Sequence, residues 1–150
     1  MNKIDFNHLR ALNDWQAARF NGKNSIYVDI DLAPYRIKEG AQEWLNKEII
    51  DQTARRFRNK VNQAVFGNAS RRYGKELTIV IHLHETPHKH LHCVIEAPEQ
   101  MMPLKFKSII ENICFKDGWL KQPRYFSETK DQAAAQHYNG RFGPDTAILF

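Results

Sequence analysis

The segment from Leu77 to Glu96 constrains the fold of this chain more than any other. It contains two runs that alternate apolar with polar residues, Leu77–His84 and His90–Glu96, and five residues including Pro87 separate them. Alternation with a period of two predicts strands with one buried face, and so short a connection joins antiparallel neighbours. The sequence therefore predicts a β-hairpin here.

Histidines cluster on this hairpin. Five of the chain's seven histidines fall within eleven residues, at His82, His84, His88, His90 and His92. Strand parity places four of them, all except His88, on the face opposite the apolar residues. Directly opposed residues on neighbouring strands have Cβ atoms roughly 4.5–5.5 Å apart. Imidazoles at that spacing can bind one divalent cation, such as Mn²⁺, Co²⁺ or Zn²⁺.

Three histidines are the predicted metal ligands. His90 and His92 lie on the second strand, and His84, which we expect opposite His90, is the preferred third ligand. His82, expected opposite His92, is the second choice. Glu85 has suitable chemistry but falls on the wrong face by parity. A closed zinc site and a merely polar sheet face remain alternatives.

The rest of the chain predicts a single α+β domain over residues 1–150. The expected order is strand, helix, two strands, helix, strand, helix, at 25–32, 39–66, 77–84, 90–96, 104–116, 124–128 and 131–139. Helical spacing of apolar residues from Trp44 to Val65 supports the first helix, with Trp44 on its core face and Gly67 at its end. This order fits an antiparallel sheet with helices packed on it, of the ferredoxin-like or RRM-like type.

Charge favours a nucleic-acid partner. The net charge is +5 with a pI near 9.3, and residues 55 to 75 contain no acidic residue. The candidate phosphate contacts are Arg55, Arg56, Arg58, Lys60, Arg71 and Arg72. A solvated helix face is the alternative for this basic run. Trp44, Tyr73 and Trp119 are candidates to stack on bases, although core packing is favoured for Trp44.

The compartment is predicted to be the cytoplasm. No apolar run approaches the roughly 20 residues of a membrane helix, and the N-terminus does not resemble a secretory signal. Cys93 and Cys114 lie far apart in apolar segments, so we expect reduced, buried thiols.

His90-Leu91-His92, in a strand that follows a turn, resembles the His-hydrophobic-His motif of the HUH endonucleases. These include rolling-circle replication initiators, plasmid relaxases and single-tyrosine transposases. The Thr86-Pro87 turn is similar to one in several replication initiators, and the segment 27–32 stands where the family has its first strand motif. The resemblance implies an HUH domain in which these histidines and a third polar ligand hold a metal that polarises a phosphate.

The resemblance also implies a tyrosine nucleophile on a helix after the hairpin, commonly in a Tyr-x-x-Lys pattern. Tyr138 and Arg141 match this spacing, with arginine where the family usually has lysine. The planar guanidinium of arginine is not equivalent to the compact ammonium group of lysine, although its positive charge can still stabilise a phosphate. Tyr125 is a rival nucleophile in an expected strand.

The implied activity is a metal-dependent nickase that cuts single-stranded DNA, forms a 5′-phosphotyrosine and rejoins strands. The implied cofactor is Mn²⁺ or Mg²⁺, with Zn²⁺ and Co²⁺ as alternatives. Partners would be single-stranded DNA or a DNA hairpin. Nothing after Tyr138 resembles a helicase, so a host helicase would unwind the duplex.

Two other functions stay open. A non-catalytic relic of the fold would keep single-strand binding but not cutting, and the arginine at position 141 is the kind of departure such a copy would show. A cupin-like metal-binding domain is suggested by the spacing of His90, His92 and Glu96. The glycines expected around that pattern are missing.

Overall fold

The computed structural model of the chain describes residues 14, 18–20, 23–85, 87–129 and 146–148. Its main sheet has five strands, β1 (Ser25–Leu32), β4 (Ile79–His84), β5 (His90–Glu96), β6 (Leu120–Thr129) and β7 (Thr146–Ile148). Their spatial order is β6-β1-β5-β4-β7, and every neighbouring pair is antiparallel. β5 therefore lies at the centre of the sheet, between β1 and β4.

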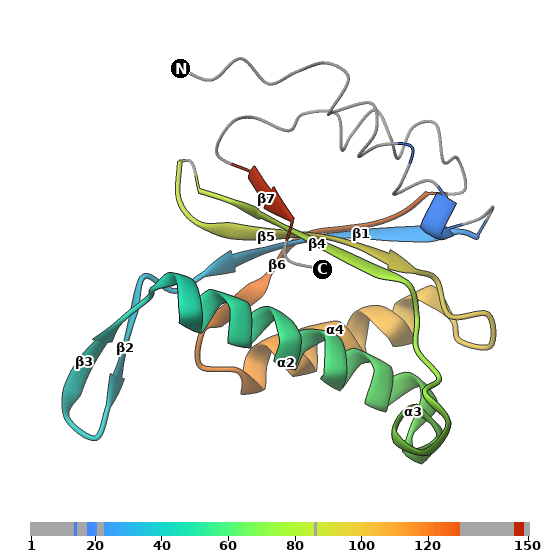
Figure 1. The fold of residues 1–150 in the computed structure, drawn as a ribbon, viewed down its shortest axis with the longest axis horizontal. Coiled ribbons are helices and arrows are strands. Elements are labelled where there is room, and N and C mark those ends of the chain that lie inside the picture. The colour runs from blue at the N-terminus through green and yellow to red at the C-terminus, as the bar shows by residue number, and fades with distance from the viewer. Residues whose placement is uncertain (1–13, 15–17, 21–22, 86, 130–145, 149–150) are drawn as a thin grey trace.

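Two long helices cover one face of this sheet (Figure 1). They are α2 (Lys47–Phe66) and α4 (Pro103–Lys116), and the short α3 (Asn68–Tyr73) follows α2. A separate ribbon of two short strands, β2 (Tyr35–Lys38) and β3 (Ala41–Trp44), precedes α2. The predicted α+β architecture, an antiparallel sheet with helices packed on it, is confirmed.

The core lies between the sheet and the two helices. The apolar residues of β1 that alternate along the strand, Ile26, Val28, Ile30 and Leu32, all face it. α2 contributes Ile50, Ala54, Phe57 and Val61, which recur at helical spacing. Leu91, Cys93 and Ile95 supply the same layer from β5. Strand parity then sends the intervening residues of β1 and β5 to the opposite face.

The opposite face of the sheet has an apolar half and a polar half. Phe20, Tyr27, Val80 and Val94 form a buried cluster of their own over one half. The other half carries the histidines of β4 and β5, and we call this surface the histidine face. It is the polar half, with His82, His84, His90 and His92, of the sheet surface opposite α2 and α4.

The first predicted helix was wrong over its N-terminal part. Residues 41–44 form β3 rather than helix, and α2 begins only at Lys47, with the side chain of Asn46 accepting a hydrogen bond from the amide of Ile49 at 2.9 Å. Trp44 is 62% exposed on β3, so its predicted core packing was also wrong. Gly67 ends α2 as predicted, with a positive φ of 57°.

Other boundaries moved less. The first strand has the predicted bounds, whereas β4 starts two residues late, at Ile79, and β6 is longer than the predicted 124–128. β2, β3 and β7 were not predicted. The helix expected at 131–139 lies outside the described residues.

Both cysteines are free and buried, as predicted. Burial raises the pKa of the Cys93 thiol well above its usual value, and burial with the nearby carboxylates of Asp117 and Glu111 raises that of Cys114 to about 12. Neither thiol is therefore a reactive thiolate at neutral pH. None of the helices among the described residues is long and apolar enough to cross a membrane.

Candidate functional site

The pairing of β4 with β5 brings the histidines together. His84 lies directly opposite His90, and His82 lies directly opposite His92, which is the register expected from the short turn. All four side chains belong to the histidine face, because Ile81, Leu83, Leu91 and Cys93 face the helices. His88, in the turn, lies beside them, with its ring centroid 6.1 Å from that of His90.

The imidazole rings approach one another closely. The ring centroid of His84 is 5.0 Å from that of His90 and 5.5 Å from that of His92. Two imidazoles that bind one metal through nitrogens at about 2.0–2.1 Å have centroids roughly 5 Å apart. The spacing of His84 from His90 and from His92 thus fits a shared cation. Within the part of the chain that the structure describes, however, no three side chains of the metal-binding types are already arranged to hold one.

His82 differs from the other three because it is fully buried. Burial, together with the nearby His92 and His84, lowers its pKa to about 3. The ring is therefore neutral at physiological pH, which is the form that binds metals. A substrate at the surface reaches His84 and His90 more readily, since both are only partly buried.

Two carboxylates face the histidines from β1. Asp29 lies directly opposite His92 and Asp31 lies directly opposite His90. The carboxylate Oδ1 of Asp29 contacts Nδ1 of His92, and Oδ1 of Asp31 is 3.3 Å from Nε2 of His88. Sequence reasoning assigned neither aspartate a role. Strand parity puts both on the side of β1 opposite Ile26, Val28 and Ile30, but parity does not say which strand becomes the neighbour.

β6 extends the site on the other side of β1. Nε of Arg124 is 3.1 Å from Oδ1 of Asp31, so the carboxylate of Asp31 contacts both the guanidinium of Arg124 and the ring of His88. Tyr125 lies directly opposite Asp29, on the side of β1 away from His92, and is 46% exposed. Because directly opposed residues share a face, this tyrosine belongs to the same surface as the histidines.

The proposed nucleophile and its partner cannot be placed in this site. Tyr138 and Arg141 both lie outside the described residues, as does the helix expected to carry them.

The basic residues predicted to contact DNA lie on the other side of the sheet. α2 covers the face opposite the histidines, and its three arginines pair with carboxylates. Arg55 binds Asp51 at 3.1 Å, Arg56 binds Asp117 at 2.7 Å and Arg58 binds Glu76 at 2.9 Å.

Glu76 directly follows the basic run and Asp51 lies one helical turn before Arg55, so the fold brings only Asp117 from a distant part of the chain. Arg71 and Arg72 on α3 are exposed, and Lys60 is partly buried.

One candidate for base stacking was wrong. Trp119 is 2% exposed, so its ring cannot stack on a nucleic-acid base. Trp44 and Tyr73 are exposed, on β3 and α3.

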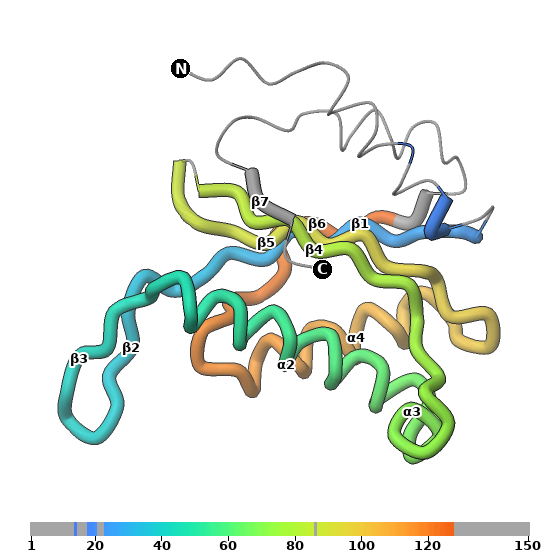
Figure 2. Tube along the Cα trace, in the orientation of Figure 1, coloured from blue at the N-terminus to red at the C-terminus, as the bar shows by residue number. Residues whose placement is uncertain are grey.

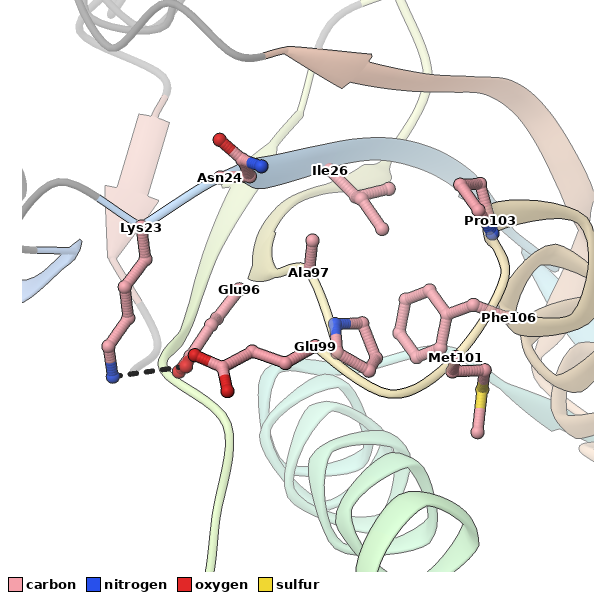
Figure 3. Close-up of a pocket in the computed structure, with 10 residues that line it drawn as sticks. Lys23, Asn24, Ile26, Glu96, Ala97, Glu99, Met101, Pro103 and Phe106 are labelled. Carbon is pink, nitrogen blue, oxygen red and sulfur yellow. Dashed lines mark ion pairs between the residues drawn. The ribbon is translucent and has the colours of Figure 1, made fainter.

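Glu96 does not join the histidines. It lies at the far end of β5, where Oε1 is 3.0 Å from Nζ of Lys23 and Oε2 accepts a hydrogen bond from the amide of Thr78 at 2.8 Å. Four residues along a strand span about 13 Å, so Glu96 and His92 do not reach one ion. Figure 3 shows Lys23 and Glu96 in a pocket of about 450 Å³ beside the apolar Ile26 and Phe106. The cupin-like ligand trio is not formed.

Comparisons of the chain with protein-family models, with curated proteins and with solved structures found no match.

Proposed function

We propose that this protein is a metal-dependent nickase of single-stranded DNA, with the ferredoxin-like or RRM-like fold of an HUH endonuclease. The observation that carries the proposal is the set of imidazoles on the histidine face, where His90 and His92 project from one strand and His84 lies opposite His90. The ring centroid of His84 lies within 5.5 Å of those of both His90 and His92, a spacing at which imidazoles can share one cation.

His84, His90 and His92 would hold the divalent cation, with His82 as the reserve ligand. The donor set fits, since neutral imidazole suits Mn²⁺, Co²⁺ and Zn²⁺, and Mg²⁺ could be held where the carboxylates of Asp29 and Asp31 take part. When bound, the cation would supply Lewis-acid polarisation of the scissile phosphate.

Asp29 is the orienting partner of this set. Its carboxylate contacts Nδ1 of His92, which fixes the tautomer with a proton on Nδ1 and leaves Nε2 with a lone pair. Arg124 and His88 both contact the carboxylate of Asp31 and hold it in place at the end of the site. One predicted ligand, His92, therefore has a supporting carboxylate that sequence reasoning had not assigned.

The nucleophile would be the phenol oxygen of Tyr138, with Arg141 steadying the phosphate. The oxygen attacks phosphorus, the bond from phosphorus to the 3′ oxygen breaks, and the phenolic proton ends on the released 3′-hydroxyl. The product is a 5′-phosphotyrosine, and the reverse reaction joins strands. A phenol with a pKa near 10 needs the positive surroundings of the site to react at neutral pH.

Tyr125 is the alternative nucleophile, and one observation favours it. It is exposed on the same surface as the histidines, directly opposite Asp29. Two strand spacings of about 4.8 Å separate its backbone from that of His92, a distance that a tyrosine side chain and a phosphate can bridge.

The test is covalent capture. The full chain is incubated with single-stranded oligonucleotides of random sequence, labelled at the 3′ end that stays with the protein, and with Mn²⁺, and the products are separated on a denaturing gel. We expect a labelled protein-sized band that requires metal. It should disappear in Tyr138→Phe and persist in Tyr125→Phe; the reverse pattern would move the nucleophile to β6.

Two further variants test the metal site. His90→Ala and His92→Ala should each abolish the covalent band, while Phe115→Ala, a change at an exposed position of α4, should leave it intact. A band that survives both histidine changes would remove the metal assignment. Binding of the oligonucleotides without any covalent band would identify the protein as a non-catalytic relic of the fold.

A further inference from the structure

The ribbon formed by β2 and β3 projects beyond the sheet and its helices (Figure 2). Its register pairs Tyr35 with Trp44 and Ile37 with Gln42, so these residues share one face. Arg36 and Glu43 form a pair on the other face. The two faces differ in their surroundings.

The inner face of the ribbon is anchored to the body of the protein. The guanidinium of Arg36 lies 4.7 Å from the ring centroid of the buried Trp119, and its Nε is 2.7 Å from Oε2 of Glu43. A Cβ on Gly118 would lie only 3.2 Å from Nη1 of Arg36, so the arginine lies tightly against this backbone. At the base of the ribbon, the amide of Leu45 donates to the carbonyl of Pro34 at 2.9 Å.

The outer face of the ribbon is aromatic and exposed. Tyr35 is 46%, Ile37 65% and Trp44 62% exposed, and the rings of Tyr35 and Trp44 lie 5.4 Å apart between centroids. Contact with each other explains part of this pairing, because cross-strand aromatic pairs stabilise hairpins. It does not explain why an apolar surface on an anchored projection faces water.

The ribbon begins at the end of the sheet that carries the histidines. β1 leads into β2 through only Ala33 and Pro34, and Asp31 near the end of β1 lies opposite His90. The amide of Leu32 donates to the carbonyl of Lys89, in the turn that carries His88, at 3.1 Å. A polymer bound at the histidine face would therefore reach the base of the ribbon by passing around this end of the sheet, since the ribbon extends on the side that α2 and α4 cover (Figure 1).

We infer that the outer face of the ribbon binds single-stranded DNA that flanks the histidine face, by stacking bases on Tyr35 and Trp44. The inference rests on the proposed function and adds the structural element that binds the single-stranded DNA. Exposed aromatic rings stack on any base, and exposed cations nearby supply the phosphate contacts. The exposed lysines nearest to the ribbon in the chain are Lys38 at its tip, on the Arg36 side of the ribbon, and Lys47 at the start of α2.

The first measurement is affinity for 5′-fluorescein-labelled (dT)₂₀, by fluorescence anisotropy at low salt, with the full chain and no added metal. Tyr35→Ala and Trp44→Ala should each raise the Kd about tenfold, which matches the loss of one stacked base. Trp44→Phe should keep most of the affinity. Phe115→Ala, which removes an exposed ring from α4, a helix not assigned to DNA, is the matched control and should have the wild-type Kd.

The second measurement is the quenching of tryptophan fluorescence by (dT)₂₀. Wild type should be quenched, and Trp44→Phe should lose that quenching while circular dichroism shows the same fold. Wild-type affinity and quenching in the ribbon variants would overturn the inference. So would no binding of (dT)₂₀ by the wild type, or a dimer in sedimentation velocity that Trp44→Ala dissociates, since the occupant would then be a second copy.

Parallel covalent capture separates this inference from the proposed function. If wild type forms the metal-dependent band but the ribbon variants bind (dT)₂₀ normally, the ribbon assignment fails and the nickase stands. If the ribbon variants lose affinity but wild type forms no band, the nickase fails and the ribbon remains a single-strand binding element.

Discussion

At the scale of single residues, two aspartates have distinct tasks. Asp29 contacts a histidine on the surface where we place the reaction, whereas Asp117 binds Arg56 on the far side of the sheet. Arg56 had been predicted to contact DNA. Its partner carboxylate is almost completely buried, so this arginine holds α2 to the chain just after α4.

Asp29→Asn should weaken binding of Mn²⁺ by about 10- to 100-fold, because an amide orients the imidazole of His92 less firmly than a carboxylate does. Isothermal titration calorimetry measures the Kd directly. Asp51→Asn, which removes an exposed carboxylate from α2, should leave the Kd unchanged. Equal affinity of Asp29→Asn and wild type would mean that Asp29 does not support a metal ligand.

Asp117→Asn should destabilise the fold by about 1–2 kcal/mol at pH 7, as expected for the loss of a charged hydrogen bond. Burial acts to raise the pKa of Asp117, but the hydrogen bonds from Arg56 and from the amide of Trp119, with the charges of Arg56 and Lys60, lower it overall. A folded-state pKa below the unfolded value of 3.8 stabilises the protein fully above that pH. The stabilisation is lost as the pH falls through the folded-state value.

Urea unfolding at pH 7 and pH 3 checks this, and the difference between wild type and Asp117→Asn should shrink at pH 3. Glu76→Gln breaks the more exposed pair with Arg58 and should cost less at pH 7. A penalty for Asp117→Asn that is the same at both pH values would exclude the ion pair as its cause.

At the scale of elements, the ribbon of β2 and β3 includes a segment where the sequence pattern wrongly predicted helix. Trp44, Leu45 and Ile49 recur at helical spacing, so the pattern favoured one long helix from Glu39. Strands of only four residues offer too little alternation to compete with it. The decisive signal was local, since Glu39 and Gly40 both adopt positive φ, at 52° and 77°, as the central residues of a two-residue hairpin turn.

The same turn gives a prediction about stability. Glu39 is strained at positive φ, so Glu39→Asn should stabilise the protein by about 0.5–1 kcal/mol, because asparagine tolerates this conformation. Gly40→Ala should destabilise it by about 1–2 kcal/mol. Thermal unfolding should show shifts of about 2–4 °C per kcal/mol in opposite directions. Two shifts of the same sign would contradict the turn geometry.

At the scale of the whole molecule, the hairpin of β4 and β5 was predictable because alternation and a short turn fix its register. That register alone placed His84 opposite His90 and His82 opposite His92. The contributions of Asp29, Asp31 and Arg124 were not predictable. They depend on β1 lying between β5 and β6, an arrangement set by tertiary packing that periodicity along one strand does not reveal.

The two faces of the sheet also separate the charges from the histidines. A basic run in sequence suggested one DNA track, but α2 and α3 lie on the side away from the histidine face. A DNA strand that contacts both the histidine face and the side of α2 and α3 must pass around the protein. Arg71 and Arg72 on α3 are exposed members of the run, and replacing them tests whether the DNA reaches this side.

Replacing Arg71 and Arg72 by glutamine should reduce the slope of log K for (dT)₂₀ against log salt concentration by about 1.4, since each phosphate contact on a single strand contributes roughly 0.7. A paired change on the exposed end of α4, Lys105→Gln with Lys107→Gln, removes equal charge from a helix not assigned to DNA and controls for the general field. Equal slopes in both double variants would confine the DNA to the histidine face and the ribbon, because only a direct phosphate contact releases counterions locally.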